Sequence, residues 1–217
     1  MKVSVIVGLL AALLALGAVG CGAGASSSGS VAQASAEDPT SACTGKRTPP
    51  DRGRPPALPA GRYFVPGSPR RQSLRERGMP GVLLTLSGRV YDERCKPVAR
   101  ALLDFFQADS HGRYDRKEVR LHGYQYTGTR GGYVLLTIVP NHYLRRPPHI
   151  HVRVQAPNGP VLETQLFFPG KLRAYGMHVA ALNAHDRSFK PALTVRLGPR
   201  RGNRYAATFD FVIAVTP

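Results

Sequence analysis

Residues 143–154 read YLRRPPHIHVRV, and this stretch decides how the fold is interpreted. After the double proline, an isoleucine and two valines alternate with polar residues, which is the pattern of a half-buried β-strand. Side chains two residues apart in a strand share a face, so His149 and His151 are expected to point the same way. The stretch therefore predicts a strand that presents two imidazoles together, an arrangement that suits a metal ion or a polar edge face.

The same period-two pattern recurs along the chain in segments bounded by Gly, Pro, Asn or Asp. The segments predicted as strands are LLTLSGRVYD (83–92), ALLDFFQAD (101–109), GYVLLTIVP (132–140), HIHVRVQAP (149–157), VLETQLFFPG (161–170) and ATFDFVIAV (207–215). Helical periodicity is weak and confined to Ala174–Ala184, and the sequence has no internal repeat and no phosphate-binding glycine loop. We therefore expect an all-β fold, an antiparallel β-sandwich with an irregular N-terminal arm.

The N-terminus has the layout of a bacterial secretory signal, with Lys2 before an apolar run that ends in small residues and Cys21. We interpret residues 1–20 as a signal peptide of the lipoprotein type, with Cys21 as the lipidated residue. Simple secretion is the alternative, because Ala18 stands where lipoprotein signals usually have Leu. Either interpretation predicts a protein of the bacterial cell envelope outside the cytoplasm, held at the membrane by a lipid anchor or secreted.

Three further segments follow the signal. Residues 21–42 are rich in Gly, Ala and Ser and predict a flexible tether, since they contain too little apolar surface to fold. Residues 43–78 are rich in Pro and Arg and predict an extended arm. Residues 79–217 have the size of one compact domain.

The chain is strongly basic, with 30 Lys and Arg against 13 Asp and Glu and a formal net charge of +17. Such a charge favours contact with anionic polymers or lipid headgroups of the envelope. Nucleic-acid binding is not expected, because the basic residues are scattered and the compartment is wrong.

Three cysteines remain to be placed in an oxidising compartment. If Cys21 carries the lipid, Cys43 and Cys95 are left as a disulfide pair that fixes the arm to the domain. Two unrelated thiols are the alternative.

Two tyrosines stand where the chain turns, Tyr114 after ADSHGR and Tyr143 after IVPNH. A trivalent metal favours the phenolate form of tyrosine, because a bound cation changes the local pKa. Two phenolates and two imidazoles form a hard anionic ligand set that suits Fe(III). Half-buried packing is the alternative role for a tyrosine at a turn.

Three runs in the same order carry a resemblance to a known family, and this resemblance covers roughly residues 43–217. They are LTLSGRVYDERCKPVARALLDFFQADSHGRYD, GGYVLLTIVPNHYLRRPPHIHVRV and LETQLFFPG. The chain resembles the intradiol ring-cleavage dioxygenases, the protocatechuate and catechol dioxygenase family, and it is most similar to their short, secreted bacterial branch. The resemblance implies a non-haem Fe(III) enzyme that cleaves a catecholic ring between its two hydroxylated carbons with O2, giving a muconate-type product.

The resemblance also implies a role for each motif residue. Tyr114 and Tyr143 match the phenolate ligands, and His149 and His151 match the imidazole ligands. Tyr143 would in addition leave the metal and accept a proton from the catechol.

Arg146 and Gln165 match the polar pair on the substrate side of the family's site, and Cys43 and Cys95 match cysteines of its secreted members. At Asn141 the family usually has Gly, and Asn is the next best residue for a left-handed turn.

Two non-enzymatic functions remain as alternatives. One is a transthyretin-like β-sandwich that binds carbohydrate or protein without a metal, and the other is a structural lipoprotein held on the envelope by its charge.

Overall fold

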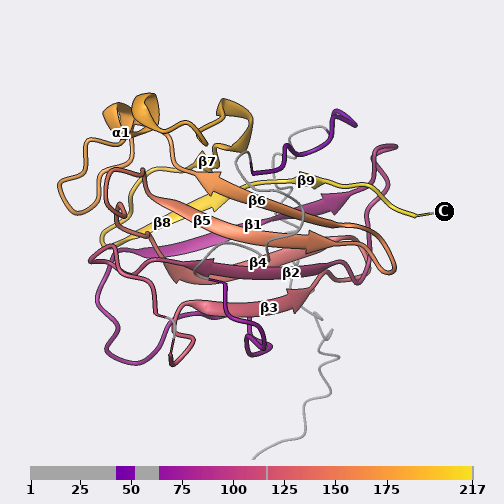
Figure 1. Cartoon of the computed structure of the whole chain (residues 1–217), viewed down its shortest axis with the longest axis horizontal. Helices are drawn as coiled ribbons and strands as arrows, with labels where there is room; N and C mark the ends of the chain where they lie inside the picture. The colour runs from indigo at the N-terminus through magenta and orange to yellow at the C-terminus, as the bar shows by residue number, and fades with distance from the viewer. Residues whose placement is uncertain (1–42, 52–63, 116, 217) are drawn as a thin grey trace, which may run out of the picture. The chain divides into compact units, whose positions relative to one another are not determined.

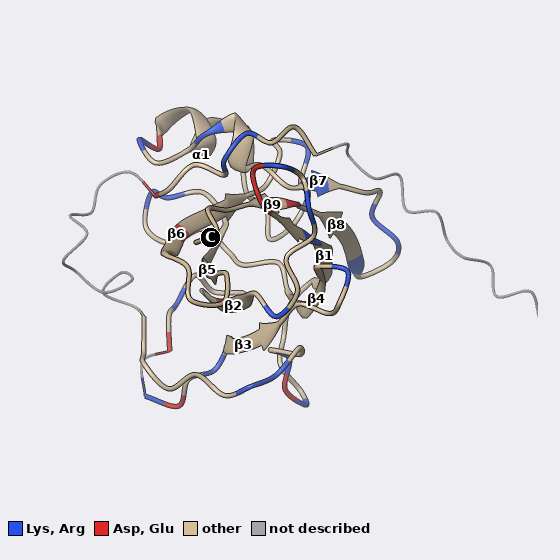
Figure 2. Cartoon of the chain, turned by 90° about the vertical axis from the view of Figure 1, so that its right-hand side faces the viewer, with Lys and Arg blue, Asp and Glu red and all other residues tan. Residues whose placement is uncertain are grey.

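The computed structural model describes residues 43–51, 64–115 and 117–216. In these residues two β-sheets face each other, and Figure 2 shows their strands nearly end-on as two layers. One sheet has the strand order β3-β2-β5-β6, and the other has the order β4-β1-β8-β7, with β9 also paired to β1. The predicted β-sandwich is confirmed.

The elements follow one another along the chain as Figure 1 shows. Their bounds are β1 Leu83–Tyr91, β2 Leu102–Gln107, β3 His122–Tyr126, β4 Gly132–Ile138, β5 His149–Gln155, β6 Val161–Phe167, α1 Val179–His185, the 3₁₀ turn η1 Pro191–Leu193, β7 Arg196–Leu197, β8 Arg204–Thr208 and β9 Phe211–Val212.

The sheet that contains β1 differs from the expectation in two ways. Both β8 and β9 pair with β1 in parallel, whereas all pairs in the other sheet are antiparallel. The segment predicted as one strand at 207–215 is divided between β8 and β9. The division falls where the chain passes close over Gly88, since a Cβ at this glycine would lie 1.8 Å from the Phe209 carbonyl oxygen. There the Asp210 carboxylate accepts a hydrogen bond from the Arg89 amide at 2.8 Å.

The strand of the opening motif, β5, lies inside its sheet between β2 and β6. Its aliphatic side chains Ile150, Val152 and Val154 are at most 1% exposed and belong to the core between the sheets. The period-two pattern thus places His149 and His151 on the opposite, outer face of the same sheet.

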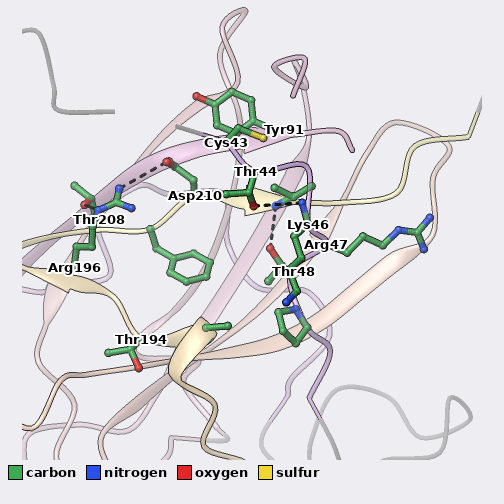
Figure 3. A pocket seen from close by; sticks show the side chains of 14 residues that line it. Cys43, Thr44, Lys46, Arg47, Thr48, Tyr91, Thr194, Arg196, Thr208 and Asp210 are labelled. Carbon is green, nitrogen blue, oxygen red and sulfur yellow. Dashed lines mark hydrogen bonds and ion pairs between the residues drawn. The ribbon is translucent and has the colours of Figure 1, made fainter. Parts of the chain in front are cut away.

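The N-terminal arm is joined to the domain by a covalent bond and by hydrogen bonds. Cys43 and Cys95 form a disulfide with a Cα–Cα distance of 5.7 Å, which confirms the predicted pair. The amide of Thr48 donates to the Val212 carbonyl, and the Val212 amide donates to the Thr48 hydroxyl, both at 2.9 Å. Figure 3 shows this part of the arm across a pocket of about 240 Å³ from Arg196.

Several sequence interpretations fall outside the described residues. They are the signal peptide at 1–20, the tether at 21–42, lipidation at Cys21 and the middle of the arm at 52–63. Across the described ranges, no helix is both long enough and apolar enough to cross a bilayer.

Candidate active site

The outer face of the β3-β2-β5-β6 sheet carries one row of side chains that crosses all four strands. Register places His122, Phe106, His151 and Gln165 next to one another in this row. The Phe106 ring stacks on the His151 ring with centroids 4.4 Å apart and an angle of 2° between the planes. An aromatic ring therefore supports His151 from the β2 side.

The His149 ring is oriented by a hydrogen bond to the carbonyl of Pro147. Its Nδ1 lies 2.7 Å from the Pro147 carbonyl oxygen, which can only accept, so Nδ1 carries the proton. Burial, followed by the charge of Arg146, lowers the pKa of His149 to about 4. The imidazole is therefore neutral at pH 7, and its Nε2 has a lone pair available to an acid or a metal.

Three of the four predicted ligand side chains meet at this nitrogen. The Tyr114 hydroxyl lies 2.9 Å from His149 Nε2. The Nε2 atom of His151 lies 3.2 Å from the same atom. The fourth side chain, Tyr143, packs edge-on against Tyr114 with ring centroids 5.4 Å apart. All four predicted residues thus form one cluster.

The two tyrosines come together because the loops that carry them are bonded to each other. The amide of Asn141 donates to the Asp109 carbonyl at 3.0 Å, and its side-chain amide donates to the Ser110 carbonyl at 2.9 Å. Gly112 has φ of +74°, and a Cβ there would lie 2.1 Å from the His142 carbonyl oxygen. Only glycine allows this close approach of the two loops.

The expectation that Asn141 takes a left-handed conformation was wrong. In the second tyrosine's loop the positive φ belongs to Leu144, at 54°. Leu144 lies inside a tight turn that the Arg146 amide closes by donating to the Tyr143 carbonyl at 2.9 Å. Asn141 contributes through its side chain instead, because that amide bridges the two loops.

Arg146 and Gln165 lie beside the cluster. The Nη2 atom of Arg146 donates to Gln165 Oε1 at 2.7 Å, and its Nη1 lies 3.4 Å from His149 Nε2. The neighbouring Arg145 is exposed. The polyproline-like path after Arg146 brings it into line with His149, three residues later.

Two further residues of the site were missed by sequence analysis. Asp186, directly after α1, accepts from Arg146 Nε at 2.9 Å. Asp51, in the arm, accepts a hydrogen bond from the Gln165 amide. Neither carboxylate lies in a motif, and both are far along the chain from their partners, so the sequence contains no local signal for them.

The cluster fits a metal ion by its geometry and by its chemistry. Nitrogen and oxygen ligands about 2.0–2.2 Å from one metal lie roughly 3 Å apart when they are adjacent. The separations of 2.9 and 3.2 Å around His149 Nε2 match this spacing. Among the described residues, no three His, Cys, Asp or Glu side chains gather around a possible metal position. A metal held by His149 and His151 would therefore depend on the tyrosine oxygens, and a set with phenolate oxygens suits a hard trivalent ion.

Comparison with known proteins agrees with the fold and the motifs. A family model described as Dioxygenase matches residues 60–214, well over half of the chain. The chain belongs to the intradiol dioxygenase family. Among curated relatives, the protocatechuate 3,4-dioxygenase beta chain of Burkholderia cepacia is 35% identical over 108 residues, which are 42% of this chain and 46% of the relative.

A second curated relative, the hydroxyquinol 1,2-dioxygenase of Nocardioides simplex, is 28% identical over 187 residues, 71% of this chain and 62% of the relative. The chain thus spans about half to three fifths of the length of these two relatives. Among solved structures, the dioxygenase domain of a dioxygenase carbohydrate-binding protein fusion from Streptomyces sp. SirexAA-E is 43% identical, with a TM-score of 0.67, covering 79% of this chain and all of that one. The 3-chlorocatechol 1,2-dioxygenase of Rhodococcus opacus 1CP is 25% identical with a TM-score of 0.63, covering 72% of this chain and 71% of that one.

Proposed function

We propose that the protein is a non-haem Fe(III) dioxygenase that cleaves a catecholic ring between its two hydroxylated carbons. Both atoms of O2 enter the product, a muconate-type dicarboxylate. The observation that carries this proposal is the meeting of Tyr114 Oη and His151 Nε2 at His149 Nε2, at 2.9 and 3.2 Å. The substrate class rests on the relatives, whose names include protocatechuate, hydroxyquinol and chlorocatechol dioxygenases.

Four side chains would hold the iron: Tyr114, Tyr143, His149 and His151. When bound, the iron supplies Lewis acidity that makes the chelated catecholate open to attack by O2. His149 is suited to ligation because its proton is on Nδ1, bonded to the Pro147 carbonyl.

The remaining roles fall to side chains beside the four ligands. In the proposal Tyr143 accepts a catechol proton on its phenolate oxygen, which lets the substrate bind through both oxygens. Arg146 stabilises negative charge that develops on the ring, and its Nη1 already points to the centre, 3.4 Å from His149 Nε2. Gln165 orients the reacting ring from the β6 side.

The non-catalytic transthyretin-like sandwich is not favoured. It gives Tyr114 and Tyr143 ordinary packing roles and gives no reason for a neutral, buried His149 to face a phenol and a second imidazole. A purely structural lipoprotein does not explain this arrangement of His149, the phenol and the second imidazole either.

We also propose that the protein is located outside the cytoplasm, either as a lipoprotein anchored through Cys21 or as a secreted protein. The Cys43–Cys95 disulfide supports an oxidising compartment. Mass spectrometry of the N-terminal peptide from the native host distinguishes a diacylated Cys21 from an unmodified N-terminus.

An iron assay and an optical spectrum of the purified protein test the enzyme function. We expect one iron per chain, a red-brown tyrosinate-to-Fe(III) absorption band, and conversion of catechol, protocatechuate or hydroxyquinol to a ring-opened diacid labelled by ¹⁸O2. Tyr114→Phe should alter the band and weaken iron binding. A colourless wild-type protein that stays inactive after iron loading would refute the proposal.

A further inference from the structure

The two carboxylates outside the motifs, Asp186 and Asp51, lie at opposite ends of one chain of hydrogen bonds. Asp186 binds the guanidinium of Arg146, Arg146 binds the amide oxygen of Gln165, and the Gln165 amide nitrogen binds Asp51. The chain of bonds joins four separate segments: the end of α1, the loop before β5, strand β6 and the N-terminal arm. It therefore fixes the polar side of the active site from two directions.

The contacts of the guanidinium determine where its free edge points. Nε donates to Asp186 Oδ2 at 2.9 Å, and Nη2 lies 3.5 Å from Asp186 Oδ1 and 2.7 Å from Gln165 Oε1. A guanidinium is planar, so holding Nε and Nη2 leaves no rotation for Nη1. Nη1 is the nitrogen that lies 3.4 Å from His149 Nε2. Asp186 thus aims the Arg146 charge at the cluster.

Asp186 is itself buried and has a second hydrogen bond. Its side chain is 5% exposed, against 30% for Arg146. It ends α1 in an extended conformation, and its Oδ1 accepts a hydrogen bond from the Ser188 amide at 2.7 Å. This side-chain turn holds the carboxylate through a bond that does not involve Arg146.

Asp51 acts in the same way on Gln165, whose side chain is 2% exposed. Arg146 can only donate and the carboxylate of Asp51 can only accept, so together they fix which end of the Gln165 amide is oxygen and which is nitrogen. The Asp51 amide donates to the Glu163 carbonyl at 2.9 Å, which places the arm along β6. The Nζ atom of Lys190 donates a hydrogen bond to the carbonyl oxygen of the neighbouring arm residue Pro50 at 2.6 Å.

We infer that Asp186 and Asp51 are positioning residues for ring cleavage, and that the arm is thereby a working part of the active site. The inference rests on the proposed function and adds the residues that set the geometry of Arg146 and Gln165. Neither carboxylate is expected to bind the metal, because each reaches the cluster only through another side chain.

Four variants test the inference in the iron-loaded full chain: Asp186→Asn, Asp51→Ala, Asp51→Asn and a control, Asp210→Asn. The control also removes a carboxylate that pairs with an arginine, Arg196, at 3.7 Å, but on the other sheet. We expect Asp186→Asn and Asp51→Ala to keep wild-type iron content and the wild-type absorption band, and to lower kcat about ten- to a hundredfold. KM should change less than kcat. Asp51→Asn keeps an acceptor oxygen for Gln165 and should recover most of the activity that the alanine variant loses, while Asp210→Asn should turn over like the wild type.

Turnover of Asp186→Asn and Asp51→Ala within about twofold of the wild type, at equal iron, would overturn the inference. A parallel fall in iron content, melting temperature and turnover would also overturn it, since that pattern indicates a role in folding alone. A crystal structure of Asp186→Asn gives a measurement independent of turnover. In that structure Arg146 Nη1 should no longer lie near His149 Nε2. If the wild type binds no iron and cleaves no catechol, the proposed function fails. The positioning role is rejected separately if Arg146 has the same position in the crystal structures of Asp186→Asn and the wild type.

Discussion

Arg146, in the loop before β5, donates to Gln165 of β6 at 2.7 Å, and this bond distinguishes Arg146 from Arg145, its neighbour in the sequence. Arg146 is directed inward by the bond, whereas Arg145 is exposed. The two residues are therefore a natural pair for a test of function.

Arg146→Ala should keep the iron and lower catechol turnover roughly a hundred- to a thousandfold, the typical cost of losing one preorganised charge. Arg145→Ala should have almost no effect, because its charge is solvated. Steady-state kinetics and iron content of both variants decide the matter. Low turnover in Arg145→Ala with wild-type turnover in Arg146→Ala would show that the roles of the two side chains are reversed.

Gly112→Ala should weaken iron binding, because the new Cβ would lie 2.1 Å from the His142 carbonyl and would push apart the loops that carry Tyr114 and Tyr143. Gly176→Ala is the matched control, since Gly176 has a similar φ of +71° but no atom within 4 Å of the place that a Cβ would take. Both variants should lose roughly 1 kcal/mol or more of stability from the positive φ. Only Gly112→Ala should also lose the tyrosinate absorption band, and equal bands in both variants would contradict this account.

Replacing both Cys43 and Cys95 by alanine should lower the free energy of unfolding by about 4 kcal/mol. This is the chain-entropy value for closing a loop of 52 residues, the separation of the two cysteines. Chemical denaturation of the variant and the wild type under non-reducing conditions measures the difference. A change below about 1 kcal/mol would mean that the arm stays in place without the disulfide.

Tyr133 should make the protein sensitive to alkali. Burial, with the charge of Asp210 in addition, raises the pKa of Tyr133 well above its ordinary value of 10.0. The unfolded chain ionises near the ordinary pKa and the folded chain does not, so this contribution to stability is complete below about pH 9 and is lost as the pH rises above 10.

Tyr133→Phe should therefore show a smaller fall in melting temperature between pH 8 and pH 11 than the wild type. At pH 8 the variant should be less stable by about 1 kcal/mol, because Tyr133 donates to the Phe209 carbonyl at 2.8 Å. Tyr126→Phe, at a position 44% exposed, serves as the control. Identical pH slopes for wild type and Tyr133→Phe would reject the assignment.

Strands with regular alternation could be predicted from the sequence, and β5 and β6 begin at the expected residues. Strand β3 could not, because its core-facing residues are Gly123 and the buried Gln125, which give no hydrophobic alternation. Strand β7 has two residues, too few for any period. Parallel pairing of β8 and β9 with β1 depends on contacts between distant segments, which no local pattern encodes.

The candidate site shows the same division. Its motif residues, such as His149 and His151, could be found because their spacing within one strand has a geometric meaning. Asp51 and Asp186 could not, because they reach the site only after the arm and α1 have folded against β6 and the loop before β5. Their contribution is a property of the tertiary structure.

The pairing of β1 with β8 has a consequence for how the chain folds. Leu83, the first residue of β1, pairs with Arg204, the first residue of β8, so this sheet closes only when the two ends of the domain meet. Contacts between such distant segments slow folding, since the entropy of closing the loop is lost before the contact forms. During synthesis, β1 can pair early with β4 but must keep its other edge open until β8 has left the ribosome. We expect refolding to be slow, and its rate to depend more on substitutions in β1 and β8 than on substitutions in the β5–β6 hairpin.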